Sequence, residues 1–569
     1  MNLSRKLEFK PKFISELKDY NLKKFKEDLI AGIVVGIVAL PLAIAFGIAS
    51  GVTPTVGLIT AIIGGFLVSA LGGNSVQIGG PTGAFIVIIY NIISNYGLTG
   101  LAIATFMAGV ILVLLGLFKL GTIIKFIPYP IVVGFTSGIA LTIFSTQIVD
   151  LFGLQIDKVP SDFIGKWVAY FSNFDTMSFS TLFVGLITIL IIALTPRVNK
   201  KLPGALIAII IMTLAVYLLK HFCGISGIET IGDRFGTLSH DIPRPHEIGV
   251  NMNSINLLLP SAFTIAILGA IESLLSATVA DGATGNKTSS NTELIGQGVA
   301  NIVVPFFGGI PVTGAIARTM TNITNGGRTP VAGVIHAIVL LLIFLFLMPL
   351  INYVPMACLA GVLVVVAYNM SGWRTVRGIL KNPKSDIAVL ATTFLLTVIF
   401  DLTIAIEIGM LLAALLFIRR VTENTSIHVF SNQIDVADGT EVLHKEILNV
   451  ADGVEIYEIN GPFFFGVANK FDEMMLNMGD KPAVRILRMR HVPFIDSTGI
   501  HNLETLIQSS KREGIHVVLS GVIPSVREVL EHANIPDLIG ADHICDHISK
   551  AVTLANSLVK DQNLHQISW

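Results

Sequence analysis

Apolar residues dominate the chain between residues 28 and 420, where long hydrophobic runs alternate with short polar connections. A helix needs about 20 mainly apolar residues to cross a bilayer, so this pattern predicts about fourteen membrane-spanning helices. They begin near Leu29, Val56, Thr82, Leu98, Phe126, Thr181, Pro203, Leu257, Leu294, Thr313, Val331, Val354, Ile387 and Leu402, and those at Thr82 and Thr313 are short. We expect a polar N-terminal segment at residues 1–27 and an all-α membrane domain at residues 28–420.

The composition and the placement of charge agree with this division. The chain is 52% hydrophobic and 14% charged, with a mean hydropathy of +0.74. If the number of spans is even, the lysine- and arginine-bearing connections fall on the same side as the basic N-terminus. Positive charge gathers on the cytoplasmic side of membrane proteins. We therefore expect a multi-pass protein of the cell (inner) membrane with both termini in the cytoplasm.

Two short motifs nearly repeat each other, GGPTGA at Gly79 to Ala84 and GGIPVTGA at Gly308 to Ala315. They mark the third and the tenth predicted spans. Interrupted spans at matching positions of two halves are typical of transporters whose broken helices point their free N-terminal amides at the substrate. Helix starts favour an anion because their N–H groups are unpaired and partly positive. About seven spans in each half make the repeats inverted in topology.

Each motif carries a threonine followed by a glycine, Thr82–Gly83 and Thr313–Gly314. A hydroxyl at this place can cap free amides, or it can hydrogen-bond a ligand. The glycine leaves the backbone uncovered and allows an anion to approach closely. These four residues are candidates for substrate binding, and helix capping is the alternative for the threonines.

Two ionisable residues at membrane depth are further candidates. Arg318 follows Thr313 within the tenth span, where a cation is costly unless it is paired or faces water. It can neutralise the substrate, or it can pair with Glu272, with Glu407 or with helix-end carbonyls. Glu272, in the eighth span, can take up and release a proton or hold a sodium ion as the site opens to each side, and Ser276 shares its helix face. A structural salt bridge is the alternative for Glu272.

The C-terminal part is of another kind. After a linker at residues 421–440, short apolar strands alternate with amphipathic helices and predict a soluble α/β domain at residues 441–560. The segment FIDSTGI places Asp496, Ser497 and Thr498 at a helix start, which indicates helix capping or, alternatively, phosphorylation of Ser497. No phosphate-binding or nucleophile motif occurs there, and the three cysteines are widely spaced. We expect no enzyme activity, metal site, cofactor or nucleic-acid partner.

Taken together, these segments resemble the SulP family of anion transporters with a C-terminal STAS domain. The resemblance rests on LIAGIVVGIVALPLAIAFGIASG near the N-terminus, GGPTGAF, GAIESLLSATVADG, GQGVANIVVPFFGGIPVTGAIART and FIDSTGI. It covers nearly the whole chain. The segments GAIESLL, GQG, FFGG and AIAR are closest in pattern to the subgroup of the bacterial C4-dicarboxylic acid transporter.

The resemblance implies a fold, an assembly and a set of site residues. The fold is a seven-plus-seven inverted repeat divided into a core and a gate, commonly in a homodimer, and the anion binds between the third and tenth spans. Carried over by position, Thr82, Gly83 and Ala84 line one side and Ala315, Ile316 and Ala317 line the other. Arg318 matches the family's basic residue near the anion, and Glu272 matches its acidic coupling residue.

The expected function is secondary active uptake of sulfate or a related small oxyanion or carboxylate, such as bicarbonate or a C4-dicarboxylate. Glutamate at position 272 favours protons as the coupling ion over sodium, and the core would move against the gate like an elevator. An uncoupled exchanger or channel of the same family is the main alternative. A membrane-bound scaffold that works through its STAS domain, and a nucleobase permease of the same architecture, are two others. The STAS domain can also bind a cytoplasmic regulator.

Overall fold

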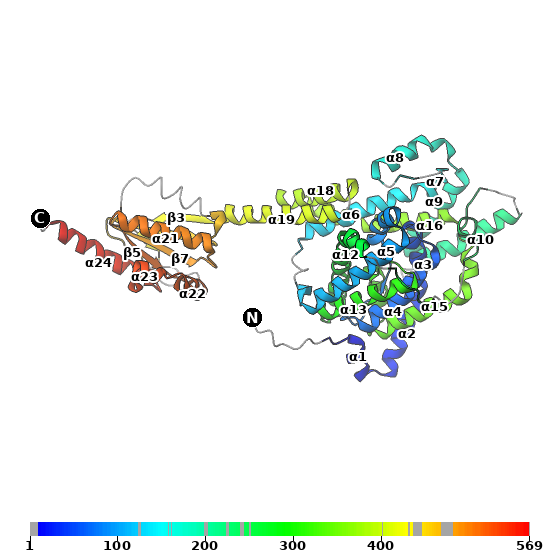
Figure 1. The fold of residues 1–569 in the computed structure, drawn as a ribbon, viewed down its shortest axis with the longest axis horizontal. Helices are drawn as coiled ribbons and strands as arrows, with labels where there is room; N and C mark the ends of the chain where they lie inside the picture. The colour runs from blue at the N-terminus through cyan, green and yellow to red at the C-terminus, as the bar shows by residue number, and fades with distance from the viewer. Residues whose placement is uncertain are drawn as a thin grey trace. The chain divides into compact units, whose positions relative to one another are not determined.

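Helices make up almost all of the first of two compact units in the computed structural model, Met1–Ala413 and Ala414–Trp569 (Figure 1). The structure describes residues 9–122, 127–156, 159–160, 162–198, 203–222, 227–238, 244–249, 252–400, 402–430, 433–435, 447–467 and 482–567. Residues 1–8 of the predicted N-terminal segment, most of the last ten residues of the predicted linker and the predicted start of the α/β domain at 441 lie outside these ranges.

The helices of the first unit follow the predicted apolar runs. They are α1 (Lys12–Glu16), α2 (Leu22–Ala49), α3 (Pro54–Ile59), α4 (Gly65–Leu71), α5 (Ile86–Leu117), α6 (Tyr129–Thr146), α7 (Ile148–Phe152), α8 (Phe163–Ser172), α9 (Phe179–Val198), α10 (Gly204–Phe222), α11 (Ile231–Phe235), α12 (Met252–Thr284), α13 (Ser290–Val303), α14 (Ile316–Thr324), α15 (Val331–Ile351), α16 (Met356–Met370), α17 (Trp373–Ile379) and α18 (Lys384–Ile399). Helix α19 (Leu402–Asn424) runs across the boundary between the units. Single turns link them at η1 (Leu17–Asp19), η2 (Thr60–Gly64), η3 (Gly83–Phe85), η5 (Phe174–Thr176) and η6 (Val304–Phe307).

The helical segments are consistent with the predicted spans. Within the described residues, 9 helices are long and apolar enough to cross a membrane. One of them, Gly83–Leu117, contains the predicted third and fourth spans together. It is interrupted at Gly97, whose φ of 68° is not helical. Because α14 is short, as the sequence predicts for the tenth span, it does not count among the long helices.

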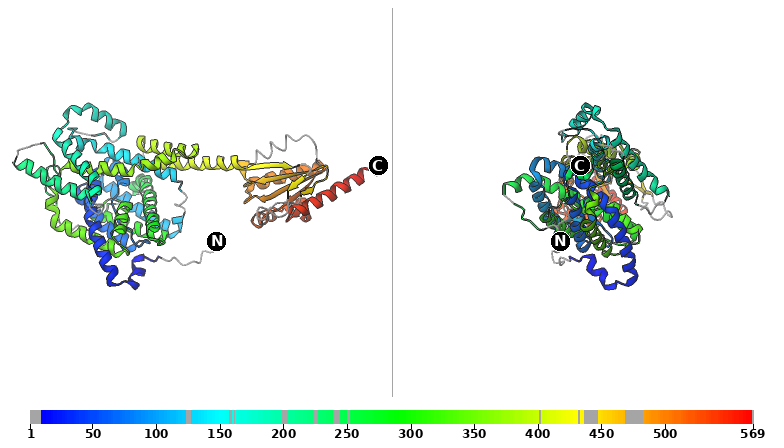
Figure 2. Two further views of the ribbon diagram at one scale, coloured as in Figure 1. Left: turned by 180° about the vertical axis from the view of Figure 1, so that it is seen from behind. Right: turned by 90° about the vertical axis from the view of Figure 1, so that its right-hand side faces the viewer.

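By their packing contacts, the helices of the first unit, seen from two further sides in Figure 2, form two groups. In one group, α5 packs against α12 and α13, and α2 packs against α15. Small residues allow the close approach, since a side chain at Gly109 would meet the backbone of α13 near Gly298 and Ile302. In the other group, α6 packs against α16 and α18, and α9 packs against α10 and α16. These groups are the candidates for the expected core and gate.

A two-stranded antiparallel sheet lies within the first group. Strand β1 (Gly79–Gly80) belongs to the first motif and β2 (Thr313–Gly314) to the second. Gly79 is paired with Gly314 and Gly80 with Thr313. The two motifs, more than 200 residues apart in the sequence, therefore touch through their backbones.

The second unit is an α/β domain, as predicted. Its strands are β3 (Ser426–Phe430), β4 (Gln433–Asp435), β5 (Ile447–Asn449), β6 (Val454–Asn460), β7 (Val484–His491), β8 (His516–Ser520) and β9 (Ile544–Cys545). Five of them form a sheet of order β3-β6-β7-β8-β9, in which only the β3–β6 pair is antiparallel. The remaining elements are α21 (Ser497–Arg512), α22 (Pro524–His532), α23 (Ile535–Ile539), η7 (Ala541–His543) and α24 (Ile548–Ile567).

Alternating side chains of the sheet fill two separate cores. On β7, Leu487 and Met489 pack in the core formed with α21, α22 and α23. Val484 and Ile486 on the same strand pack in the core formed with α24. Successive residues of a strand point to opposite faces, so helices cover the sheet on both sides.

Candidate functional site

The pairing of β1 with β2 brings two helix starts together. After β1 the chain turns into η3 and α5, and after β2 it turns into α14. Because the strands are antiparallel, the two helices leave the sheet in opposite directions. Neither start has a side-chain cap: Thr82 precedes η3, Ala315 precedes α14, and neither side chain accepts a bond from its own helix. The first amides of a helix have no partner within it, so both starts keep donors for a ligand.

The helices begin later than the prolines predict. The sequence suggests that Pro81 and Pro311 start the broken helices, whereas the structure has the starts at Gly83 and Ile316. The reason is that Thr313 and Gly314 are engaged as strand β2. The residues between each proline and its helix are extended.

Thr82 connects the first motif to Glu272. Its hydroxyl donates a hydrogen bond of 2.8 Å to Oε2 of Glu272 on α12. Both side chains are partly accessible. No ion pair joins Glu272 to a cation within the described part of the chain, so the alternative of a structural salt bridge with Arg318 is not observed there. The acid thus lies beside the first helix start with one hydrogen bond from a neutral group.

Thr313 is attached to the same helix α12, but by neutral groups only. Its hydroxyl lies 2.7 Å from Oγ of Ser273 and donates to the carbonyl of Gly269 at 3.0 Å. Ser273 also accepts a bond of 3.2 Å from the amide of Gly314. Thr313 is 0% exposed. The second motif is therefore fixed to α12 by hydrogen bonds among buried, uncharged groups.

Ser276 adds a third contact between α12 and the motifs. Its hydroxyl donates to Oγ1 of Thr319 at 3.2 Å, and the same oxygen of Thr319 accepts from the amide of Ile78 at 3.1 Å. Ser276 and Glu272 are one turn apart on α12, as the sequence predicts, but Ser276 contacts α14 whereas Glu272 contacts Thr82.

Arg318 lies between the motifs and is only 1% exposed. Its guanidinium donates to the carbonyl of Pro81 at 3.1 Å and to that of Gly79 at 3.4 Å. The observed partners are therefore backbone carbonyls of the first motif, and neither a carboxylate nor the carbonyls of a helix end. A side chain at Gly80 would lie 1.8 Å from Nη1 of Arg318, and Gly80 has a φ of 155°, so this close approach requires glycine.

The remaining predicted site residues divide by exposure. Gly83, Ala84 and Ala315 are buried, whereas Ile316 and Ala317, in the first turn of α14, are exposed. The structure thus brings both helix starts, Arg318 and Glu272 together. Ile316 and Ala317 border this cluster on its open side.

Sequence reasoning missed the residues that cover Gly83. A side chain there would lie 2.9 Å from the sulfur of Met370, 3.2 Å from Ile143 and 3.5 Å from Phe46. Met370 is on α16 and Ile143 on α6, so helices of the second group cover the first helix start. Gln77 was also missed. It is buried, and neither its amide oxygen nor its amide nitrogen has a partner within the described residues.

Ser497 lies far from this cluster in the sequence and belongs to the second unit. Asp496 caps α21 by accepting a bond of 2.8 Å from the amide of Gly499, and it also accepts from Phe465 at 3.2 Å. Ser497 is the first residue of the helix and is exposed. The geometry shows the predicted cap and leaves the hydroxyl of Ser497 accessible.

The chemistry available at the helix starts is binding and proton exchange. The cluster offers amide and hydroxyl donors, one guanidinium and one carboxyl group. Within the described residues, no group of three or more histidines, cysteines or acidic residues could hold a metal ion. Donors around a small space suit an oxyanion, and a carboxyl beside them suits a proton or a cation.

Comparisons with known proteins point in the same direction. The profile described as "Sulfate permease family" matches residues 25–393, and that described as "STAS domain" matches residues 447–551. The chain is 42% identical over 94% of its length to the "Putative sulfate transporter YvdB" of Bacillus subtilis (strain 168), of which it covers 99%. It is 30% identical over 94% of its length to the bicarbonate transporter BicA of Synechocystis, of which it covers 94%.

A solved structure shares the fold over nearly the whole chain. It is the murine Solute Carrier 26 family member A9 anion transporter in the inward-facing state, with a TM-score of 0.84. The two chains are 19% identical, and the match covers 98% of this chain and 96% of the other. The fold is thus shared although most residues differ.

Proposed function

This chain belongs to the sulfate permease family and carries a STAS domain, and we propose that it imports sulfate or a related small oxyanion or carboxylate by proton-coupled secondary active transport. Bicarbonate and C4-dicarboxylates belong to the same chemical range. The observation that carries this proposal is the hydrogen bond from Thr82, at the first helix start, to Glu272. It connects an anion site and a proton-accepting group in one contact.

The anion binds between the two helix starts. Thr82, Gly83 and Ala84 form one side, and Thr313, Gly314, Ala315, Ile316 and Ala317 form the other. Two uncapped starts offer amide donors and the positive ends of two helix dipoles. Arg318 adds a positive charge, because no carboxylate neutralises it within the described residues, and its bonds to two carbonyls hold the first motif in place.

Glu272 is the coupling residue, with Ser276 beside it on α12. When Glu272 is ionised, its negative charge lies next to the anion site and disfavours a second anion. When it is protonated, that repulsion is removed. Binding of a proton and of an anion are therefore expected to reinforce each other, which is the requirement for symport. Sodium in place of the proton is a second way to neutralise Glu272.

Movement of one helix group against the other opens the site in turn to each side. Support comes from the packing, since the motifs belong to the group around α5, α12 and α13, whereas Met370 and Ile143, which cover Gly83, belong to the other group. The antiparallel β1–β2 pair is the contact that inverted repeats would make. We further propose cytoplasmic termini, a homodimer, and a cytoplasmic regulator that binds the STAS domain, with Ser497 as a candidate phosphorylation site.

Uptake into proteoliposomes tests this function. Radiolabelled sulfate, bicarbonate and succinate would be supplied with and without an inward proton gradient. We expect one of them to accumulate only with the gradient, and Glu272→Gln to remove the dependence on the gradient. Glu407→Gln is the matched control, because Glu407 is also a glutamate of an apolar helix but is exposed on α19.

Two other uptake results would change the proposed coupling. Uptake that ignores both the gradient and Glu272→Gln would overturn proton coupling and favour an uncoupled exchanger or channel. Accumulation that follows a sodium gradient and still needs Glu272 would replace the proton by sodium at the same residue.

A further inference from the structure

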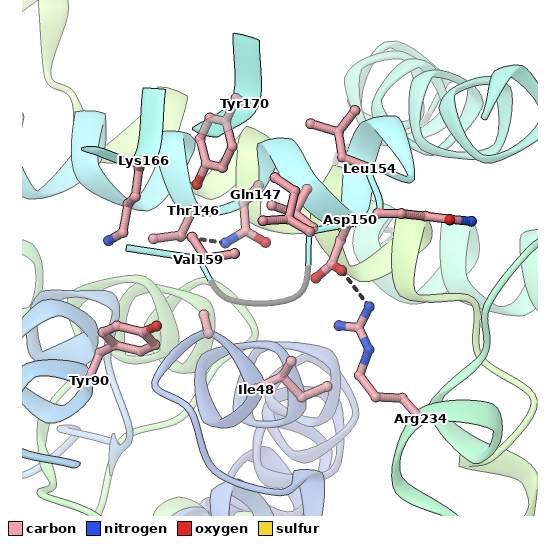
Figure 3. A pocket seen from close by; sticks show the side chains of 14 residues that line it. Ile48, Tyr90, Thr146, Gln147, Asp150, Leu154, Val159, Lys166, Tyr170 and Arg234 are labelled. Atoms are coloured by element: carbon pink, nitrogen blue, oxygen red, sulfur yellow. Dashed lines mark hydrogen bonds and ion pairs between the residues drawn. The ribbon is translucent and has the colours of Figure 1, made fainter. Parts of the chain in front are cut away.

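A cavity lies at the end of α2 remote from its N-terminal residue Leu22. It has a volume of about 580 Å³, and its lining includes Ile48, Tyr90, Gln147, Lys166 and Tyr170 (Figure 3). Tyr90 follows Thr82 by eight residues on the same helical segment, which is about 12 Å along a helix axis. The cavity therefore shares a helix with the proposed anion site but contains none of the motif residues.

Lys166 is the unusual member of this cavity. It lies on the short helix α8, between the predicted fifth and sixth spans, and is only 5% exposed. Its ammonium lies 5.3 Å from the centre of the Tyr90 ring (Figure 3). No carboxylate lies within ion-pair distance of it in the described part of the chain. Burial lowers the pKa of Lys166, and the nearby charge of Asp162 acts in the opposite direction.

The other cation of the cavity is already neutralised. Arg234, on α11, forms an ion pair of 2.7 Å with Asp150 and a second one with Glu229. In Figure 3 this pair lies at the other end of the cavity from Lys166 and Tyr90. Two carboxylates thus face Arg234, and Lys166 is the lining cation that has no ion pair within the described residues.

That end also offers a free hydroxyl and room. The hydroxyl of Tyr170 is buried beside that of Ser145, and neither meets the geometry of a hydrogen bond within the described residues. A buried polar group usually has one. A water molecule takes about 30 Å³, so the cavity can hold a small anion together with several waters. A buried cation, a hydrogen-bond donor and space thus occur together, and no carboxylate of the described residues pairs with the cation.

We propose that this cavity is a second binding site for a small oxyanion, held by the ammonium of Lys166 and the hydroxyl of Tyr170. The choice of ligand class rests on the proposed function, but the site itself does not. If the termini are cytoplasmic, the end of α2 at Ala49 lies on the extracytoplasmic side of the membrane. Anions from that side would then bind in this cavity before they reach the site between the motifs. A single uncompensated cation in a low-dielectric recess raises the local concentration of anions.

A tryptophan beside the cavity makes the site measurable, because Trp167 contacts the lining residue Tyr170. Trp167 follows Lys166 on α8, and its ring centre lies 5.8 Å from that of Tyr170. The chain has three tryptophans. Replacing Trp373 and Trp569 by phenylalanine leaves Trp167 as the reporter. Iodide quenches tryptophan emission on contact and is itself a small anion, whereas acrylamide is a neutral quencher.

The test compares iodide quenching in detergent-purified full-length chains at constant ionic strength. We expect Lys166→Gln to lower iodide quenching of Trp167 several-fold and to leave acrylamide quenching unchanged. Sulfate, with gluconate as the control salt, should protect Trp167 from iodide in the parent chain and not in the variant. Lys220→Gln is the matched control, because Lys220 is paired with Asp233 at 2.6 Å.

Equal iodide quenching in the Lys166→Gln and parent chains would overturn the proposal, as would equal effects of Lys166→Gln and Lys220→Gln. No gradient is present, so the result is independent of proton coupling. Glu272→Gln should retain the full iodide response whether or not its transport is coupled. A failure of this site and a failure of the proposed function are thus separate results.

Discussion

The two motifs are nearly the same in sequence, yet the structure treats their threonines differently. Thr313 is 0% exposed and bonded to Ser273 and to the carbonyl of Gly269. Thr82 is partly accessible and bonded to the ionisable Glu272. Both hydroxyls reach α12, but only one of these contacts can change its charge. The second motif is thus held by buried neutral contacts, whereas the first contacts a side chain that can take up a proton.

Arg318 completes the difference. It projects from the second motif's helix α14 and holds two carbonyls of the first motif. Through Arg318, the second motif therefore holds the backbone of the first motif in position. Substitutions in either motif test this difference. We expect the largest effects on uptake and stability where the two motifs contact each other.

Gly80→Ala should have the largest effect. Its side chain would lie 1.8 Å from Nη1 of the buried Arg318, and the φ of 155° disfavours any side chain. Overpacking of this kind costs about 1–3 kcal/mol, and here it also displaces the guanidinium that joins the motifs. We expect uptake to be lost and the melting temperature of the purified chain to fall by several degrees. Gly282→Ala, on α12 with nothing within 4 Å, is the control. An active, stable Gly80→Ala chain would contradict the close packing of the motifs.

Thr313→Val should mainly reduce stability. Valine keeps the shape but leaves the buried oxygen of Ser273 with one hydrogen bond fewer. Unsatisfied buried groups cost about 1–3 kcal/mol, so we expect a clear drop in melting temperature together with a loss of uptake. Thr321→Val is the control, because that hydroxyl bonds only to the carbonyl of Ala317 in its own helix, in an exposed setting. An unchanged melting temperature would mean that Thr313 does not anchor the motif.

Local patterns predicted much of this arrangement. The apolar runs predicted the helices, and the paired motifs predicted two helix starts, although these lie at Gly83 and Ile316 and not at the prolines. The ligands of Arg318 were harder, because the sequence suggested carboxylates as well as carbonyls and the observed carbonyls lie 239 and 237 positions away. Only the folded arrangement decides among such partners.

Other features leave no periodic trace in the sequence. The cover over Gly83 comes from Phe46, Ile143 and Met370, which are ordinary apolar residues on three helices. The interruption at Gly97, by contrast, lies directly before Leu98, where the sequence predicts that the fourth span begins. Lys166 had a weak signal, because a lysine between Phe163 and Trp167 interrupts an aromatic helix face.

Thr82→Val should affect transport more than stability. The hydroxyl is partly accessible, and its loss removes the contact between the helix start and Glu272. A hydrogen bond to a charged group contributes about 1.5–3 kcal/mol, which is at least about tenfold in rate if it is lost during transport. We expect uptake to fall by about this factor, with an altered dependence on pH and little change in melting temperature. Thr82→Ser should retain most of the activity. A stability loss as large as that of Thr313→Val would remove the contrast between the motifs.

The smallest expected effect is on the pH dependence of the melting temperature and concerns His516 in the second unit. Burial, and then the charge of His543, lower the pKa of His516 on β8. The unfolded chain therefore takes up a proton near pH 6.5 that the folded chain accepts only at lower pH. Stability from this residue is fully present above pH 6.5 and is lost as the pH falls below it. We expect the parent chain to melt slightly earlier at pH 5 than at pH 7.5, and His516→Gln to reduce that difference, whereas the exposed His501→Gln should not. If His516→Gln leaves the difference unchanged, the acid sensitivity of the melting temperature lies at another residue.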